Sequence, residues 1–241
     1  MHTGSALRRL LKPIPGIAHV YRWSRPALQV FGELLFPKWT QNYYQLSGFW
    51  GSFDIPVERE RHARTLAAAR RYRPGIWDSA LEIGCSEGVF TLHLAECCRA
   101  VHATDISDVA CRRAAERCAS YPQVRVERRD LVHDNITLSY DLIFVLDVLE
   151  YVFGKDQLAA VAEKLANAVR HSGLLVVSDY ELCEERRRHR LTRRFVMDRD
   201  SRLEFFIKHP DLHLVHEEYY PEVGRPIPNY LGHIIAVFEK R

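Results

Sequence analysis

From residue 79 to residue 178, short runs of β-branched and apolar residues alternate with longer stretches rich in Ala, Arg and Glu. The short runs have the length of buried strands, and the longer stretches repeat apolar residues at helical spacing. This alternation is typical of a parallel sheet with crossover helices. We therefore predict parallel strands at residues 80–83, 100–104, 124–127, 141–146 and 174–178, with helices near residues 88–97, 109–120 and 157–171.

The last forty residues have a different pattern. A helix-like stretch at residues 201–209 precedes two apolar runs, at residues 212–219 and 233–239, which are joined by a loop containing Pro and Gly. Strands that are this close in sequence are connected as an antiparallel hairpin, because a parallel connection needs a longer crossover. We predict an α/β fold with a seven-stranded, mostly parallel sheet that ends in an antiparallel hairpin.

Residues 1–60 lie outside this pattern and are rich in aromatic and basic residues. We predict an N-terminal helical extension over residues 1–60 and one α/β domain over residues 61–241. Three roles for the extension stay open: helices packed on the flank of the domain, a lid over a ligand site, or a surface that docks to a membrane or a protein. The aromatic residues concerned are Tyr21, Trp23, Phe31, Phe36, Trp39, Tyr43, Tyr44, Phe49 and Trp50.

The composition of the chain indicates a folded globular protein. The chain is 47% hydrophobic and 27% charged, which is typical of a folded globular protein, and its net charge of +3 gives little long-range attraction to nucleic acid. The longest apolar stretch, residues 27–36, is shorter than the about 20 residues of a spanning helix. The six cysteines form no CxxC pair. We expect a cytoplasmic protein with reduced thiols and no bound metal.

The segment ALEIGCSEGVFT, at residues 80–91, leads from a strand into a helix through a loop with two glycines. Glycines let the backbone approach a ligand, and the start of the helix offers free N–H groups. Glu82 would repel a pyrophosphate, but it suits the positively charged methionine end of S-adenosylmethionine. We predict that this cofactor contacts Glu82, Gly84, Cys85, Ser86 and Gly88.

The next two strands also end in acidic residues. Asp105 follows the glycine loop by about 20 positions, where a carboxylate can accept both ribose hydroxyls, and Ile106 comes directly after it. After the third strand, Asp130 is expected beside the adenine amino group and Leu131 against the adenine ring. The alternative for Asp130 is an ordinary helix cap.

The fourth strand, in YDLIFVLDVLEYV at residues 140–152, brings Asp147 to the carboxyl end of a central strand, where ligands bind in such sheets. We expect Asp147 to line both the cofactor and the methyl-transfer site. A base is needed only if the acceptor must lose a proton. The candidates are Asp147, Glu150, Tyr151, Asp179 and Tyr180, although Glu150 and Tyr151 are equally consistent with structural roles at a helix start.

The segments ALEIGCSEG, ATDIS, RRDL and YDLIFVLDVLEYV together resemble the successive motifs of small-molecule class I S-adenosylmethionine-dependent methyltransferases. The resemblance covers residues 48–180 and implies a Rossmann-like fold. The closing hairpin agrees with it, since dinucleotide-binding folds continue with parallel units. Two positions depart from the usual pattern: Ser86 replaces the middle glycine, and Tyr151 stands where many relatives have His, so a His base there is not implied.

The stretch at residues 52–62 is similar to the nodulation-factor N-methyltransferase family, which methylates an amino group of a chitooligosaccharide. This resemblance implies that Arg61 holds the methionine carboxylate of the cofactor, a role that suits a bidentate guanidinium. The alternative is a solvated Arg on a helix surface. For His62 and His102, structural roles are expected over catalysis. His233 stands at the start of the last predicted strand, where a structural role is expected and a place facing the cleft is the alternative.

We expect transfer of a methyl group from S-adenosylmethionine to an N or O atom of a small-molecule or saccharide acceptor. The alternatives are an RNA or protein methyltransferase, a non-catalytic binding module and a nicotinamide oxidoreductase. A nucleic-acid substrate is not favoured, because no Asn/Asp-Pro-Pro-Tyr motif follows the fourth strand. The basic run from Arg186 to Arg194 either binds acceptor anions or forms a solvated helix face. The oligomeric state stays open.

Overall fold

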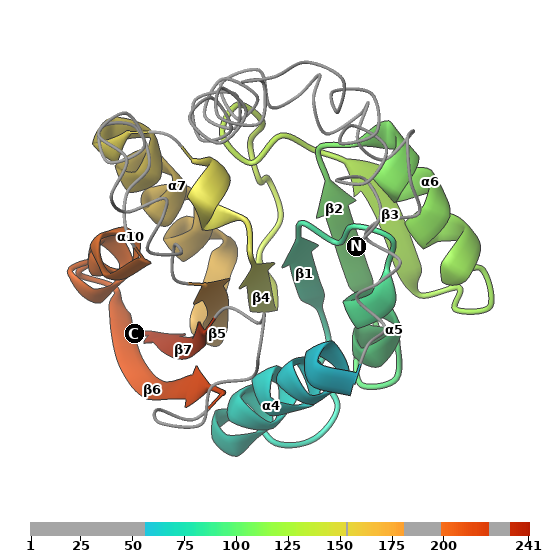
Figure 1. The fold of residues 1–241 in the computed structure, drawn as a ribbon, viewed down its shortest axis with the longest axis horizontal. Helices are drawn as coiled ribbons and strands as arrows, with labels where there is room; N and C mark the ends of the chain where they lie inside the picture. Colours follow the sequence, from blue (N-terminus) through green and yellow to red (C-terminus); the bar gives the residue numbers. More distant parts are fainter. Residues whose placement is uncertain (1–55, 153, 181–198, 222–231) are drawn as a thin grey trace, which may run out of the picture.

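A computed structural model describes residues 56–152, 154–180, 199–221 and 232–241. These residues form a seven-stranded sheet in the order β3-β2-β1-β4-β5-β7-β6 (Figure 1). The first five strands of this order are parallel, and β7 is antiparallel to both β5 and β6. The predicted fold class is therefore confirmed. The strands are β1 Ala80–Ile83, β2 Val101–Asp105, β3 Val124–Arg128, β4 Tyr140–Leu146, β5 Val169–Tyr180, β6 Leu212–Tyr220 and β7 His233–Lys240.

The central strand β4 is buried along its whole length, because helices cover both faces of the sheet. Leu142 and Phe144 belong to one hydrophobic cluster, and Ile143 and Val145 belong to a second cluster on the opposite face. A continuous apolar run is what a strand buried on both faces requires. The helices of the first face are α4 Pro56–Tyr72, α5 Val89–Ala95 and α6 Asp108–Arg117, and those of the second are α7 Lys155–Ala168 and α10 Arg199–Ile207 (Figure 1).

The largest difference from the predicted boundaries lies between α7 and β5. The helix expected to run to His171 ends at Ala168, and β5 begins at Val169. Val169 already has the extended backbone of a strand, with φ −76° and ψ 132°, and it pairs with Tyr140 of β4. The pairing with β4 then shifts its register before Leu142. Pairing with β4 thus outweighs the helical pattern of the sequence at these positions.

Several predictions concern parts of the chain outside the described residues. The roles of the N-terminal aromatic residues and of the basic run from Arg186 to Arg194 stay predictions. The expected division between residues 60 and 61 falls inside α4, which begins at Pro56. Among the residues that the structure describes, no helix has the length and apolar composition needed to cross a membrane.

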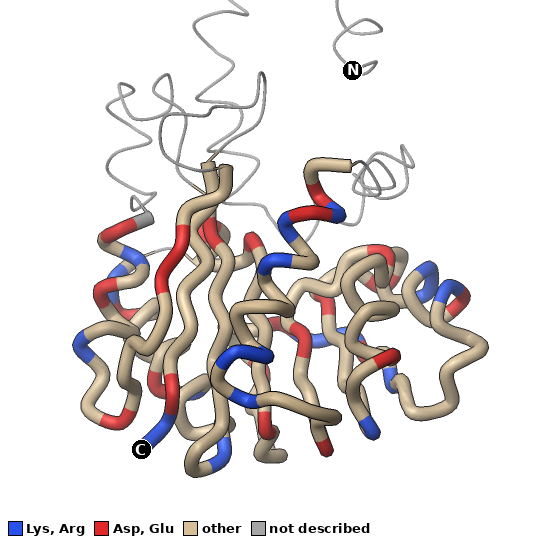
Figure 2. Tube along the Cα trace, turned by 90° about the horizontal axis from the view of Figure 1, so that it is seen from below, with Lys and Arg blue, Asp and Glu red and all other residues tan. Residues whose placement is uncertain are grey.

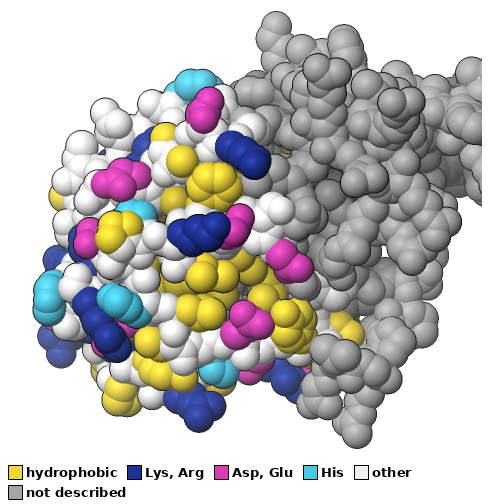
Figure 3. Space-filling model, turned by 90° about the vertical axis from the view of Figure 1, so that its left-hand side faces the viewer, with side chains coloured by type: hydrophobic (Ala, Val, Ile, Leu, Met, Phe, Trp, Pro, Cys, Tyr) yellow, Lys and Arg dark blue, Asp and Glu magenta, His cyan; other side chains and the backbone are white. Residues whose placement is uncertain are grey.

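The surface of the described part mixes charges of both signs. Figure 2 shows Lys and Arg interspersed with Asp and Glu, as the low net charge predicts. Figure 3 shows the side on which α10 lies, where hydrophobic side chains occur among charged ones. Exposed apolar residues on α10 and β6 include Ile207 and Leu214.

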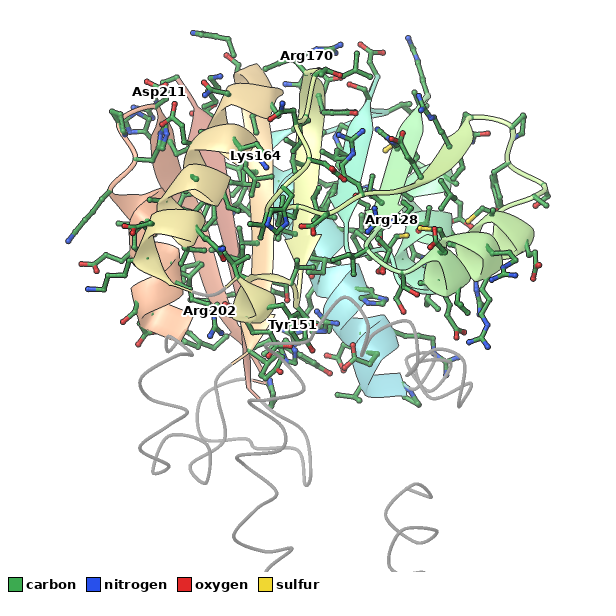
Figure 4. All side chains as sticks on the ribbon, turned by 90° about the horizontal axis from the view of Figure 1, so that it is seen from above. Arg128, Tyr151, Lys164, Arg170, Arg202 and Asp211 are labelled. Carbon is green, nitrogen blue, oxygen red and sulfur yellow. The ribbon has the colours of Figure 1, made fainter. Side chains whose placement is uncertain are left out.

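The two ends of the sheet carry different polar groups. At the amino end of β4, the Asp141 carboxylate accepts hydrogen bonds from Arg73, Arg170 and both the backbone N–H and the hydroxyl of Ser79. These contacts join the segment between α4 and β1 to the strands β4 and β5. Figure 4 places Arg170 at this end and Tyr151 at the other. The residues predicted to bind a ligand lie at the opposite, carboxyl end.

Candidate active site

The loop between β1 and α5 has the backbone of a tight ligand-binding turn. Gly84, Ser86 and Gly88 all have positive φ angles, of 79°, 49° and 80°. A Cβ atom on Gly84 would lie 2.3 Å from Cγ2 of Val148, so the loop presses closely against the segment after β4. Ser86 replaces a glycine but takes the left-handed conformation that glycine adopts most easily, at a cost of about 1–2 kcal/mol.

Asp105, at the end of β2, is joined to this loop. Its Oδ2 accepts the backbone N–H of Ser86 at 3.0 Å, and its Oδ1 accepts that of Ser107 at 2.9 Å. Burial raises the pKa of Asp105 to about 6, although these two N–H groups oppose the shift. Each carboxylate oxygen has a second lone pair, so hydroxyl groups can still donate to it. Ile106 follows Asp105, and its carbonyl accepts a hydrogen bond from Arg128, the residue labelled beside β3 in Figure 4.

Glu82 is a second buried carboxylate beside the loop. Its side chain is hidden from solvent and accepts a hydrogen bond of 2.6 Å from the Thr91 hydroxyl of α5. Burial, with a smaller contribution from Asp105, raises the pKa of Glu82 to about 7. Across the described residues, neither Glu82 nor Asp105 forms an ion pair. The site therefore offers two buried acidic groups to a positively charged, hydroxyl-bearing ligand.

The remaining loop residue, Cys85, contributes a buried thiol. Its Sγ lies 3.8 Å from the backbone carbonyl of Ser86. A hydrogen bond with Cys111 and burial together raise the pKa of Cys85 well above its ordinary value. Cys85 is thus a neutral thiol, and any contact with a cofactor involves its backbone or an uncharged sulfur.

Asp130 and Leu131 lie in a turn after β3. Oδ1 of Asp130 accepts the backbone N–H groups of Val132 and His133, and the Nδ1 atom of His133 lies 2.9 Å from Oδ2. Asp130 thus caps a turn rather than the helix that the sequence left as an alternative, while a contact with adenine stays a prediction. Leu131 packs into the hydrophobic cluster under α7. Its contact with an adenine ring also stays a prediction.

Lys164 of α7 fixes the position of this turn, and sequence reasoning missed it. Its ammonium group donates to the carbonyls of Leu131, Val132 and Asp134 at 2.7, 3.0 and 2.7 Å. Figure 4 shows Lys164 on α7 beside the sheet. Nothing in the sequence pattern distinguishes this lysine from a solvated one.

Arg61 and Asp147 meet at the carboxyl end of β4. Arg61 is only 2% exposed, so the alternative of a solvated Arg is wrong. Its guanidinium contacts Glu58 at 2.6 Å, the Ser178 hydroxyl at 3.0 Å and Oδ2 of Asp147 at 3.0 Å. Burial opposes ionisation of Asp147, but Arg61 and then His233 lower its pKa to about 2. Whether Arg61 also holds a cofactor carboxylate stays a prediction.

Asp147 has a strained backbone and a second basic neighbour. Its φ angle is 55°, and its N–H donates to the Ser178 carbonyl at 2.8 Å. His233 Nε2 lies 3.3 Å from Asp147 Oδ1, and this oxygen accepts no hydrogen bond from a described residue. The contact with His233 is therefore electrostatic. From the sequence, a structural role was favoured for His233 over a place facing the cleft, and the structure places it beside Asp147.

The other candidate bases fall into two groups. Asp179 makes two hydrogen bonds with Arg202, of 2.7 and 2.9 Å, and both side chains are fully buried. This pair joins β5 to α10 and makes a structural ion pair of Asp179 rather than an available base. Glu150 is buried and Tyr151 half-buried in the 3-10 helix Leu149–Tyr151. Figure 4 places Tyr151 and Arg202 at the same end of the molecule.

Two further histidines are structural, as expected. His62 is buried and packs edge-on against Phe90, with ring centroids 5.1 Å apart, and burial together with Arg61 lowers its pKa to about 3. His102 lies between the Tyr140 hydroxyl, at 2.7 Å, and Glu127, at 3.1 Å.

A family model described as a methyltransferase domain matches residues 81–175 of the chain. These residues contain the glycine loop and the carboxyl ends of β1, β2 and β4. This part of the chain is therefore similar to methyltransferase domains. The nodulation protein S of Bradyrhizobium diazoefficiens is 29% identical over 137 residues, which are 56% of this chain and 65% of that protein. The nodulation protein S of Sinorhizobium fredii is 28% identical over 119 residues, which are 49% of this chain and 54% of that protein.

A solved structure shares the fold of the methyltransferase domain. The N-methyltransferase NodS from Bradyrhizobium japonicum, in complex with S-adenosyl-L-homocysteine, superposes with a TM-score of 0.65. It is 24% identical to this chain, and the match covers 79% of this chain and 91% of NodS. The sequence alignments with the two curated relatives cover less than two thirds of each relative's length.

Proposed function

We propose that the chain transfers a methyl group from S-adenosylmethionine to a nitrogen atom of a small-molecule or saccharide acceptor, with an oxygen atom as the alternative. The proposal rests on the two buried carboxylates beside the glycine loop. A cofactor with an ammonium group, a sulfonium and ribose hydroxyls stabilises buried acidic groups. Glu82, beside the glycine loop, would repel the pyrophosphate of a nicotinamide dinucleotide. Glu82 and Asp105 thus fit S-adenosylmethionine.

Residues at the ends of four strands, together with Arg61 of α4, would hold the cofactor. Glu82 and the backbone of Gly84, Cys85, Ser86 and Gly88 would surround the methionine part. Arg61 would bind its carboxylate in exchange for part of its contacts with Glu58, Ser178 and Asp147. Asp105 would accept the ribose hydroxyls, with Ile106 beside it, and Asp130 and Leu131 would lie at the adenine. Asp147 would border the sulfonium. The bound cofactor supplies an electrophilic methyl group, and the chain aligns the acceptor with it and excludes water.

The preference for a nitrogen acceptor is supported by the relatives. NodS is named an N-methyltransferase, and the chain matches nodulation protein S in two organisms. We further propose that the protein acts in the cytoplasm, which is supported by the five free cysteines among the described residues.

A transfer assay with S-adenosylmethionine labelled on its methyl group tests the acceptor class. The acceptors are a chitooligosaccharide with a free terminal amine, its N-acetylated form, a phenol and a structured RNA. We expect label on the free amine and at least tenfold less on the N-acetylated control. Label on the RNA alone would instead support a nucleic-acid methyltransferase, and cofactor binding without transfer to any acceptor would support a binding module.

A further inference from the structure

The order of the strands divides the carboxyl end of the sheet into two halves. The glycine loop and Asp105 follow β1 and β2, on one side of β4. The strands β5 and β7 lie on the other side of β4. A cofactor held by the first half leaves the second half to the acceptor, and Asp147 stands at the border. Groups beside Asp147 on the β5 and β7 side are therefore placed to act on the acceptor.

His233 is such a group. Because β7 runs antiparallel to β5, its first residue lies at the carboxyl end of β5, in register with Tyr180. Its ring centroid is 5.7 Å from that of Tyr180, and its Nε2 is 3.3 Å from Oδ1 of Asp147. A histidine beside a carboxylate is the arrangement in which the carboxylate stabilises the imidazolium that forms when the ring takes up a proton.

Asp147 is held firmly enough to orient this histidine. The Arg61 guanidinium binds its Oδ2, while the backbone N–H of Asp147 donates to the Ser178 carbonyl. Its positive φ angle of 55° is uncommon for a residue other than glycine, and such strain is often found at functional sites. These contacts leave Oδ1 directed at His233.

The charged groups around the contact between Asp147 and His233 are themselves paired. Arg61 is paired with Glu58 as well as with Asp147, and Arg202 pairs with Asp179. His62 is held neutral by its burial, with Arg61 contributing. His62 of α4, Asp147 after β4 and Asp179 of β5 interact electrostatically with His233, and Tyr180 of β5 and Tyr220 of β6 are in register with it. The charged groups one contact further away are Arg61 on Asp147, Glu58 on Arg61, and Arg202 of α10 on Asp179.

We propose that His233 is the general base of the reaction and that Asp147 positions it. The inference rests on the proposed transfer to an amine. One N–H bond of the acceptor ammonium breaks, and its electron pair stays on the acceptor nitrogen as the lone pair that attacks the methyl group. As the new N–C bond forms, the bond between the methyl carbon and the sulfonium sulfur breaks, and its electron pair leaves on the sulfur of S-adenosylhomocysteine. The proton forms a new N–H bond on the His233 ring, which then carries a positive charge beside Asp147. No oxidant or reductant takes part.

Kinetics with two amines separate a base from a structural residue. The probes are a chitooligosaccharide with a free terminal amine, which is largely protonated at pH 6.5, and a 4-aminophenyl glycoside, whose amine is neutral there. We expect His233→Gln to slow kcat/KM for the amino sugar by about 100-fold at pH 6.5. In His233→Gln, kcat/KM for the amino sugar should then rise about tenfold per pH unit, because the fraction of neutral amine increases with pH. For the aromatic amine we expect less than about a threefold change.

The matched control is His213→Gln on β6. His213 pairs with Glu239, near the opposite end of β7 from His233. The His213→Gln change should leave both rates unchanged. Equal losses with both amines in His233→Gln, or a variant with the wild-type pH profile, would overturn the proposal. Failure of the wild-type protein to bind S-adenosylhomocysteine would instead count against the proposed function.

A titration that needs no substrate tests the contact between His233 and Asp147 independently of the kinetics. The ring of His233 is titrated by nuclear magnetic resonance in the wild-type protein and in Asp147→Asn, where the neutral amide keeps the shape but not the charge. We expect the pKa of His233 to fall by about one unit or more in Asp147→Asn. An unchanged pKa would show that Asp147 does not support the imidazolium and would overturn the proposal.

Discussion

Glu82 and Asp105 show how two carboxylates can specify the charge of a ligand. Both are buried at strand ends, and both have pKa values raised by burial, to about 7 and about 6. An acid whose pKa is raised in the folded state disfavours its own charge until a cation or a hydrogen-bond donor arrives. The free energy gained when a cationic ligand binds is therefore linked to the loss of a proton.

This linkage makes a prediction for Glu82. Below about pH 7 a fraction of Glu82 is protonated, and binding of the cationic cofactor lowers its pKa and releases a proton. Affinity for S-adenosylmethionine should thus increase as the pH rises toward about 7 and level off above it. Calorimetry at pH 6.5 in two buffers of different ionisation enthalpy measures the protons released.

Glu82→Gln should remove most of this proton release, while Glu116→Gln, which changes an exposed residue of α6, should retain it. Asp105 contributes the smaller remainder at this pH. Equal release by the wild-type protein and Glu82→Gln would mean that Glu82 does not sense the cofactor's charge.

At the scale of elements, the glycine loop and the segment after β4 are built as one unit. Gly84→Ala would bring its Cβ within 2.3 Å of Val148 and would strain a φ angle of +79°. We expect a loss of about 2–4 kcal/mol in the free energy of unfolding, from overlap and strain together. Urea denaturation followed by circular dichroism measures the loss.

The control is Gly154→Ala, because Gly154 has a φ of +89° but no neighbouring atom within 4 Å of an added Cβ. Its ψ of 151° places it in a region that is essentially restricted to glycine, so Gly154→Ala should lose about 1–3 kcal/mol from strain alone. Adding Val148→Ala to Gly84→Ala should recover part of the loss. No recovery would show that the two segments are not coupled through this contact.

The helix α7 makes a second link between elements, through Lys164 and the turn after β3. Lys164→Met removes three hydrogen bonds and leaves carbonyl groups without their donor. We expect the free energy of unfolding to fall by about 1–3 kcal/mol and affinity for S-adenosylhomocysteine to weaken, because the turn is placed at the expected adenine end. Lys155→Met, at an exposed position of the same helix, should change stability by less than about 0.5 kcal/mol. Similar effects in both variants would contradict the role of Lys164.

For the whole molecule, the sequence was sufficient to predict the sheet but not the contacts between distant side chains. The apolar runs predicted the strands, since a strand such as β4 that is buried on both faces must be apolar throughout. The start of β5 was missed because pairing of Val169 with Tyr140 depends on a strand far away in sequence.

The residues of the candidate site divide in the same way, into positions that the sequence could predict and contacts that it could not. Positions at strand ends, such as Asp105 and Asp147, could be predicted because the topology brings them to one edge. The buried pair of Asp179 with Arg202 and the contact of His233 with Asp147 could not, because each joins elements whose packing is not encoded in local periodicity. For Asp130 the sequence left two roles open, a contact with adenine and a cap. Its hydrogen bonds to the backbone of Val132 and His133 show that it caps the turn after β3.

The central claim is that S-adenosylmethionine binds at the carboxyl ends of β1, β2 and β4, with Asp105 at the ribose. Calorimetric titration with S-adenosylhomocysteine, with NAD as the comparison ligand, tests it most directly. We predict micromolar binding of S-adenosylhomocysteine and none of NAD, a loss of at least about tenfold in Asp105→Ala, and unchanged binding in the exposed control Asp156→Ala. Tighter binding of NAD, or equal affinity in the wild-type protein and a folded Asp105→Ala, would contradict the account.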